Sequence, residues 1–153
     1  MAQPWWRDGL RFSCTQCGNC CTGGEGAVWY SPAEGAALAK LLRLSQDDFE
    51  KRYTRQIGQR RSLNETPTSF GLDCVFLDRT TVPGKAICGV YEARPLQCRT
   101  WPFWPENIET PAAWEKTRRR TPCPGMGQGN LVPADQIRII RDRECVENSD
   151  APW

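Results

Sequence analysis

The stretch CTQCGNCC, residues Cys14 to Cys21, constrains this chain more than any other feature, because it places four cysteines within eight residues. Cysteines separated by two residues, as at Cys14, Cys17 and Cys20, are typical of chains that wrap thiolates around a metal ion or a cubane iron–sulfur cluster. Cys21 follows directly, and side chains of neighbouring residues usually diverge. We therefore expect Cys20 and Cys21 to bind different metals or different atoms of one larger cluster.

The chain contains nine cysteines and no histidine. A disulfide framework would need an export signal, and the polar N-terminal segment MAQPWWRDGLRF has no apolar run of that kind. An odd number of cysteines and an adjacent pair also suit disulfides poorly. Without histidine, Ser-His-Asp and Cys-His catalysis and histidine-rich zinc sites are excluded. These observations predict a thiolate metal site in a reducing cytoplasm.

Further cysteines could complete this site. Cys123, followed by Pro124, resembles the Cys-Pro that closes ferredoxin motifs and could complete the first set. Eight cysteines would supply two four-thiolate centres, and the expected ligands are Cys14, Cys17, Cys20, Cys21, Cys74, Cys88, Cys98 and Cys123. Taken alone, Cys74 and Cys88 lie in apolar strand patterns, where a cysteine is usually a small hydrophobic residue. Cys145 lies among charged residues and is expected to be a free thiol.

Two arginines, Arg94 and Arg99, flank Cys98. We expect their guanidinium groups to offset the negative charge of a thiolate cluster and to tune its potential, although ordinary ion pairs with Glu92 or Asp78 are the alternative. The net charge of +2 treats the thiols as neutral, and two all-cysteine centres of −2 each would change it to −2. Nucleic acid is therefore not an expected partner, and no apolar run approaches membrane-spanning length.

The composition predicts a small fold with little regular structure. Mean hydropathy is −0.60, and the chain has 13 glycines and 12 prolines. We expect an α+β fold, a small loop-rich single domain over residues 1–153, with short helices and a β-hairpin around a cysteine-ligated metal centre. The Trp-rich segment WPFWPEN, with Trp5, Trp6, Trp29 and Trp114, is expected to pack as core more than to line a pocket.

Local patterns place these elements. Ser31, Pro32 and Glu34 form a capping box that predicts a helix to about Leu44. Ser45 opens a second helix, in which Phe49, Tyr53 and Ile57 would share one face. The other expected elements are a polar loop over 58–69, a hairpin of 73–78 with 86–91, a helix from the Thr110-Pro111 cap to about Arg120, a loop over 121–130, a helix over 133–144 with Ile137 and Ile140 inward, and a tail over 146–153.

Four sequence blocks occur in an order that resembles a known family. They are Phe12-x-Cys14-x₂-Cys17-Gly18-x-Cys20-Cys21; Cys74-x-Phe76-Leu77-Asp78; Cys88-x-Val90-Tyr91-x₂-Arg94-Pro95; and Cys98-Arg99-x-Trp101-Pro102-Phe103. The chain resembles the YkgJ-like CxxCxxCC cysteine-cluster proteins over a core of residues 10–125, in which Cys123 matches a later cysteine. The resemblance implies zinc or iron chelation by these cysteines. The family includes the flagellin lysine N-methylase, but no S-adenosylmethionine motif is recognisable here, so methylation is not carried over.

Three functions are compatible with these features. The leading hypothesis is one or two all-cysteine iron–sulfur centres, of the [4Fe–4S] type, for electron transfer, redox sensing or cluster-dependent chemistry, with a redox or protein partner. The second is a structural zinc module in which Cys₄ sites present an interaction surface. The third is a cluster-containing enzyme that modifies proteins. No residue is predicted to be catalytic.

Overall fold

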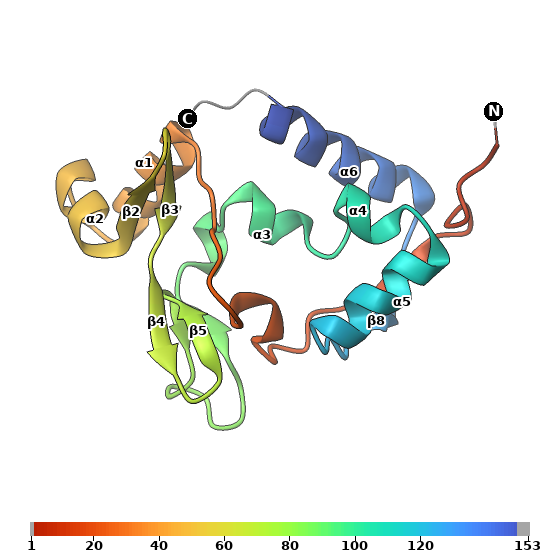
Figure 1. Ribbon diagram of the computed structural model, residues 1–153, viewed down its shortest axis with the longest axis horizontal. Coiled ribbons are helices and arrows are strands. Elements are labelled where there is room, and N and C mark those ends of the chain that lie inside the picture. Colours follow the sequence, from red (N-terminus) through yellow and green to blue (C-terminus); the bar gives the residue numbers. More distant parts are fainter. Residues whose placement is uncertain (1, 150–153) are drawn as a thin grey trace. The chain divides into compact units, whose positions relative to one another are not determined.

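The computed structural model describes residues 2–149, with side chains through residue 143 (Figure 1). The fold is a mixed α+β one of short helices and small antiparallel strand pairs. Within the described residues the chain divides into two compact units, which we call the terminal unit, residues 2–19 and 100–149, and the central unit, residues 20–99. The single domain expected over residues 1–153 stays a prediction.

The central unit consists of two helices followed by strand hairpins. Their bounds are α1 Pro32–Leu41, α2 Gln46–Tyr53, β2 Thr54–Ile57, β3 Arg60–Leu63, β4 Glu65–Thr68, β5 Gly71–Cys74, β6 Leu77–Asp78, β7 Ile87–Cys88 and the 3-10 turn η2 Tyr91–Ala93. The strands pair antiparallel as β2–β3, β4–β5 and β6–β7. Leu38 and Phe49, both fully buried, anchor the core between the two helices and the strands.

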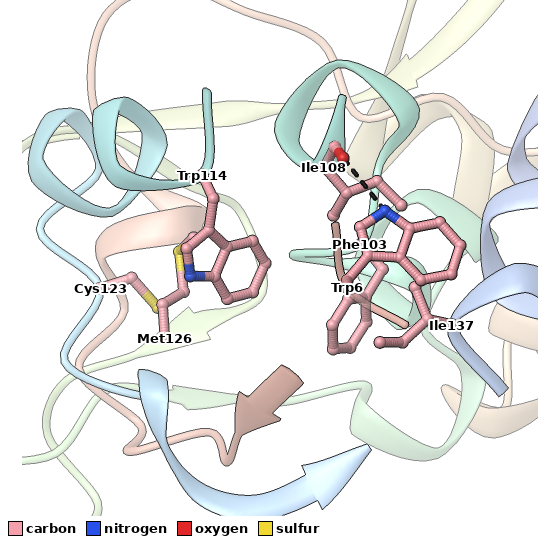
Figure 2. Close-up of a cluster of buried hydrophobic side chains, with 7 residues drawn as sticks. All are labelled: Trp6, Phe103, Ile108, Trp114, Cys123, Met126 and Ile137. Carbon is pink, nitrogen blue, oxygen red and sulfur yellow. Dashed lines mark hydrogen bonds between the residues drawn. The ribbon is translucent and has the colours of Figure 1, made fainter. Parts of the chain in front are cut away.

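The terminal unit joins the two ends of the described chain. Its elements are β1 Leu10–Phe12, α4 Pro105–Ile108, α5 Pro111–Arg120, β8 Met126–Val132 and α6 Ala134–Ser149. Strand β1 pairs antiparallel with β8, across more than 110 residues of sequence. The core of this unit includes Trp6, Trp114 and the fully buried Ile137 (Figure 2). The expectation that Trp6 and Trp114 pack as core is therefore confirmed.

The helix caps were predicted correctly. Ser31 Oγ accepts a hydrogen bond from the Glu34 N–H at 3.2 Å, and the Ser31 N–H donates to Glu34 Oε1 at 2.9 Å. Ser45 caps α2 and Thr110 caps α5 through bonds from Asp48 and Ala113. Each bond satisfies a backbone donor that the first turn of a helix leaves unpaired.

The polar loop expected over 58–69 was wrong. Strands β3 and β4 occupy most of this stretch, and Ser62 is fully buried although it is polar. Its hydroxyl accepts from the Val28 N–H at 2.9 Å and donates to the Leu63 carbonyl at 2.9 Å. Burial of a hydroxyl that forms both hydrogen bonds costs little free energy. Strand β3 can therefore be buried at Ser62 without the apolar–polar alternation by which strands are usually recognised. Ile57 accordingly lies in β2 and not on the face of α2.

Other boundaries also moved. Strand β8 occupies part of the expected loop over 121–130, and Gly127 and Gly129 both have φ of +81° there. The last helix continues to Ser149 and not to residue 144, so residues 146–149 of the predicted tail are helical, and residues 150–153 lie outside the described residues. The hairpin of 73–78 with 86–91 is confirmed, but only two residues of each strand pair. None of the helices among the described residues has the length and apolar content to cross a membrane.

Candidate metal centre

Five cysteines from separate segments of the central unit lie close enough to shift one another's ionisation. They are Cys20 and Cys21 in the 3-10 turn η1 (Asn19–Cys21), Cys74 at the end of β5, Cys88 at the end of β7 and Cys98 in helix α3 (Leu96–Thr100). We call them the central thiol group. The sequence placed Cys21, Cys74, Cys88 and Cys98 in one set, and the structure brings these four together with Cys20.

Two backbone contacts bring Cys21 and Cys74 together. The Leu72 N–H at the start of β5 donates to the Gly23 carbonyl at 2.8 Å, two residues after Cys21. Gly71 has φ of +127°, and a Cβ there would come within 2.7 Å of the same carbonyl oxygen. Only glycine permits this approach, which holds the segment that follows Cys21 against the strand that ends in Cys74.

Strand pairing places Cys88 beside the same loop. Cys88 lies opposite Leu77 in the β6–β7 pair, and the Gly89 N–H donates to the Phe76 carbonyl at 2.8 Å. Phe76 is two residues beyond Cys74. The β6–β7 hairpin thus holds the segments of Cys74 and Cys88 together by backbone hydrogen bonds.

Cys98 is positioned by two polar side chains. The second carboxylate oxygen of Glu34 accepts from the Leu96 N–H at 2.5 Å, while its first oxygen completes the cap of α1. Gln97 accepts from the Trp29 N–H and donates to the Ala27 carbonyl, both at 3.1 Å. The sequence analysis recognised Glu34 only as a capping residue and missed Gln97, because no local pattern shows a contact across more than 60 residues.

The sulfurs of Cys20 and Cys21 lie 3.7 Å apart and do not diverge. The expectation of divergence came from strand geometry, in which neighbours point to opposite faces. In the 3-10 turn η1, with about three residues per turn, neighbours are separated by only about 120°. Two thiolates on one tetrahedral ion with bonds of about 2.3 Å are about 3.8 Å apart. The adjacent pair therefore has the spacing that one shared metal ion requires.

Burial and proximity set the ionisation of the central thiol group. The hydrogen bond from the Cys21 thiol lowers the pKa of Cys20 to about 7, and the same bond, with burial, raises the pKa of Cys21 far above its usual range. Burial raises the pKa of Cys74 to about 11. Burial, then the neighbouring thiols, raises the pKa of Cys98 strongly. Without a cation the group keeps most of its protons, and a divalent metal would displace them.

Backbone N–H groups point at these sulfurs in a repeated pattern. The N–H two residues after the cysteine bonds to sulfur at Cys74 and at Cys88, and partly offsets the rise in pKa that burial causes. The same relation holds in the terminal unit, where the Gln16 N–H lies 3.4 Å from Cys14 Sγ and the Asn19 N–H 3.5 Å from Cys17 Sγ. Such bonds stabilise thiolate over thiol, as metal ligation requires.

The terminal unit holds a second set, Cys14, Cys17 and Cys123, which we call the terminal thiol group. The Asn19 side-chain amide donates to the Pro122 carbonyl at 2.6 Å and so ties the loop of Cys17 to that of Cys123. Burial raises the pKa of Cys123, with Cys17 adding to the rise. Figure 2 shows Cys123 and Met126 next to the ring of Trp114.

Trp101 also belongs to this set. Its indole N–H is buried and has no well-formed hydrogen bond among the described residues. It nevertheless lies close enough to Cys123 to offset part of the rise in pKa that burial gives this thiol. A buried N–H donor beside a thiol suits a sulfur that carries negative charge as a ligand.

Comparison with known proteins agrees with this chemistry. The model of the CxxCxxCC family, described as “Putative zinc- or iron-chelating domain”, matches residues 13–124. The chain belongs to the CxxCxxCC family. This match confirms the family inferred from the sequence blocks and supports metal binding. No solved structure matches the chain.

The two arginines of this CxxCxxCC protein differ in their surroundings. Burial raises the pKa of Cys88 and Cys98, and the Arg94 guanidinium partly offsets both shifts. Arg94 is held in place, because its Nε donates to the Tyr91 carbonyl at 3.1 Å and its guanidinium lies 3.8 Å from the centre of the Tyr91 ring. Arg99 instead lies 3.7 Å from Glu34, which is neither of the ion-pair partners considered from the sequence.

The sulfur donors of the CxxCxxCC protein fit a thiophilic metal, but their side chains are not arranged as a complete metal site. Among the described residues, no three cysteine, aspartate or glutamate side chains are arranged around one point as metal ligands are. Apart from the Cys20–Cys21 pair, the sulfurs would therefore have to move closer together to bind one metal. The side chain of Cys145 lies outside the described side chains, so its expected free thiol stays a prediction.

Proposed function

We propose that this protein holds an iron–sulfur centre on the central thiol group and uses it for electron transfer or redox sensing, with the terminal thiol group contributing ligands to a second centre. The observation that carries the proposal is the convergence of five thiols from four segments of the central unit. A single zinc ion takes four ligands, so five thiolates suit a centre with more than one metal atom better.

The nearest carboxylates are engaged elsewhere. Asp73, next to Cys74, accepts two hydrogen bonds from Arg79 at 2.7 and 3.1 Å. Glu65, opposite Cys74 in the hairpin, accepts from the Gly26 N–H at 3.0 Å and lies 3.8 Å from Arg55. Sulfur is thus the donor that remains, and sulfur selects zinc, copper(I) or iron–sulfur clusters over magnesium or calcium.

The residues around the group would shape such a centre. A bound cluster would supply one-electron chemistry. The N–H bonds at Cys74 and Cys88 and the charge of Arg94 would stabilise added negative charge and so raise the reduction potential. Exposed Tyr91, with Arg94 over its ring, would lie at the surface where a redox partner in a reducing cytoplasm exchanges electrons.

Structural zinc is the second candidate, and the 3.7 Å spacing of Cys20 and Cys21 favours it, because two ligands of one ion have this separation. In this case the metal would hold the short β4–β5 and β6–β7 hairpins and α3 together. Two-stranded hairpins are marginally stable alone, so such a link would contribute much of the stability of the unit.

Metal analysis of anaerobically purified protein separates the two. An iron–sulfur centre should give a brown protein with broad absorbance near about 400 nm that bleaches on reduction, with iron and acid-labile sulfide in equal amounts. Cys145→Ser is the matched control and should keep the full spectrum. A colourless protein that contains zinc and no sulfide would overturn the iron–sulfur proposal and establish the zinc one.

A further inference from the structure

A buried ion pair lies next to the central thiol group. Asp73 precedes Cys74 in β5, and its side chain is only 4% exposed. Arg79 donates to both carboxylate oxygens, at 2.7 and 3.1 Å, and its guanidinium lies 3.8 Å from the centre of the Phe70 ring. Apolar residues of similar volume often stabilise a fold as well as a buried ion pair does. Stability alone therefore does not explain why a charged pair occupies this position.

The carboxylate of Asp73 also faces Thr22, the residue that follows Cys21. The Thr22 hydroxyl is buried and has no well-formed hydrogen bond among the described residues. Hydrogen bonding from Arg79 holds the pKa of Asp73 below its usual value, and the nearby Thr22 hydroxyl adds to this effect. A buried hydroxyl without a complete hydrogen bond is uncommon in proteins and needs an explanation. Here the partner within reach is the carboxylate of Asp73.

The contact between these two side chains belongs to a longer alignment. Residues 21–23 and 72–74 meet in three successive pairs that run in opposite directions along the chain. The pairs are Gly23 with Leu72, Thr22 with Asp73, and Cys21 with Cys74. The first is a backbone hydrogen bond of 2.8 Å. In the third, Cys20 and burial raise the pKa of Cys21 most, and Cys74 adds to the rise. The middle pair therefore lies between a fixed backbone bond and two candidate ligands.

The position of Asp73 in β5 separates its role from that of a ligand. Neighbouring side chains of a strand point to opposite faces, so the carboxylate and the Cys74 sulfur lie on different faces of β5. Both carboxylate oxygens already accept from Arg79. Asp73 can therefore influence a metal at these sulfurs through the segment that it contacts, and not as a ligand itself.

We infer that Asp73 is a positioning residue of the metal centre and that it acts on Cys21 through Thr22. The ion pair with Arg79 fixes the carboxylate and offsets its charge beside the thiolates. Most of the central sulfurs have to approach one another to bind one metal, and a completed bond from the hydroxyl to the carboxylate would fix the end point of this movement. Hydrogen bonds around metal sites orient ligands in this way. The inference rests on the proposed metal binding by the central thiol group, but not on whether the metal is iron or zinc.

Anaerobic titration of the metal-free full chain with Co²⁺ tests this role, because thiolate ligands give bound Co²⁺ an intense near-ultraviolet absorption. Thr22→Val removes the hydroxyl and keeps the shape of the side chain. It should weaken Co²⁺ binding about tenfold and lower the thiolate absorption at saturating metal. Thr22→Ser keeps the hydroxyl and should restore both properties. Thr66→Val is the matched control, because it makes the same change at an exposed position opposite Asp73 in β4, and it should change neither property.

A cycle of variants tests whether the hydroxyl and the ion pair act together. Replacing Asp73 by asparagine and Arg79 by glutamine in one protein removes the ion pair without leaving an unpaired buried charge. This double variant should also weaken Co²⁺ binding about tenfold. Adding Thr22→Val to it should cause little further loss, because the contact is already removed. Independent, additive losses would overturn the inference.

Failure of this inference differs from failure of the proposed iron–sulfur centre. Equal Co²⁺ affinity and absorption in the wild-type and Thr22→Val proteins would overturn the positioning role, whatever metal the native protein holds. A wild-type chain that binds no Co²⁺ through sulfur would also overturn it. Zinc without sulfide in the native protein would instead remove the iron–sulfur proposal and leave the role of Asp73 intact.

Discussion

The central thiol group consists of five thiols that shift one another's pKa, whereas the terminal thiol group consists of three, one of which is part of the hydrophobic core of its unit. In the central thiol group, burial and mutual repulsion both disfavour the thiolate form. A bound cation would counteract both effects. In the terminal thiol group, Cys14 is exposed and Cys123 is buried against apolar side chains. The difference shows that the fold can assign regularly spaced cysteines to different groups: Cys14 and Cys17 belong to the terminal thiol group, and Cys20 belongs to the central one.

Removing one ligand from each group should have the largest effect. Cys98→Ser should abolish metal binding by the central group and lower the free energy of unfolding of the central unit by more than about 4 kcal/mol, because metal binding contributes directly to folding. Cys14→Ser should leave the central metal in place. Metal content per chain and thermal unfolding measure both effects.

Cys21→Ser sharpens the same comparison. It should remove the central metal, which is about half of the total if two centres form, and keep the metal of the terminal group. If Cys14→Ser and Cys21→Ser both remove all metal, the two groups are not independent sites. Full metal content in Cys21→Ser would remove this residue from the ligands.

The two cores allow a similar test. Phe49 is fully buried in the central core, with its ring 5.6 Å from Tyr30 and 6.4 Å from Tyr53. Phe49→Ala should destabilise the central unit by about 3–5 kcal/mol, and Ile137→Ala should destabilise the terminal unit by about 2–5 kcal/mol. Hydrogen exchange followed by mass spectrometry should show each loss of protection in one unit only. A loss shared equally by both units would mean that they unfold together.

Local chemistry explains which parts of the fold the sequence predicted. Caps such as Ser31 and Thr110 act within four residues, so their helices were located correctly. Strand β3 was missed because Ser62 is buried through hydrogen bonds to its neighbours, and such burial leaves no apolar pattern. Strand β8 was missed because its glycines suggest a loop, while its pairing with β1 depends on residues more than 110 positions away.

The candidate ligands were predicted better than their arrangement. Spacing and residue type identified the cysteines, since these are properties of the chain itself. The placement of Cys20 beside Cys21 depends on the 3-10 turn η1, and the position of Cys98 depends on Glu34, whose two carboxylate oxygens bond to different segments. Sequence patterns that span a few residues do not predict contacts between segments that lie far apart in the chain.

The ionisation of Cys74 predicts opposite pH responses for the metal-free and metal-loaded protein. Burial raises the pKa of Cys74 from 9.0 to about 11. A group with a raised pKa in the folded state contributes its stability fully below the unfolded pKa and loses it as the pH rises through the folded pKa. The metal-free protein should therefore lose roughly 2–3 kcal/mol between pH 9 and 11.

The metal-loaded protein should resist this alkaline loss, because its thiolates are already formed, and should lose metal as the pH falls. Anaerobic thermal unfolding of both forms across this range measures the difference. Cys74→Ala should flatten the alkaline response of the metal-free protein. A metal-free protein that is equally stable at pH 9 and pH 11 would show that Cys74 is not buried as a thiol.

The smallest effect expected concerns the two arginines beside Cys98. Arg94 offsets part of the pKa rise at Cys88 and Cys98, whereas Arg99 lies against Glu34. Arg94→Gln removes a positive charge near the sulfurs and should weaken metal binding up to about tenfold or, for an iron–sulfur centre, lower its one-electron potential by up to about 60 mV. Arg99→Gln is the matched control and should change either property much less.

Metal competition assays or redox titration measure the two variants at equal ionic strength. Raising the salt concentration should not abolish the effect of Arg94→Gln, because Arg94 is half-buried and its guanidinium is held over the Tyr91 ring. If Arg99→Gln has the larger effect, the influence of this segment on the metal acts through the Glu34 contact that positions α3, and not through charge at the sulfurs. Because both variants remove one positive charge, net charge cannot account for any difference between them.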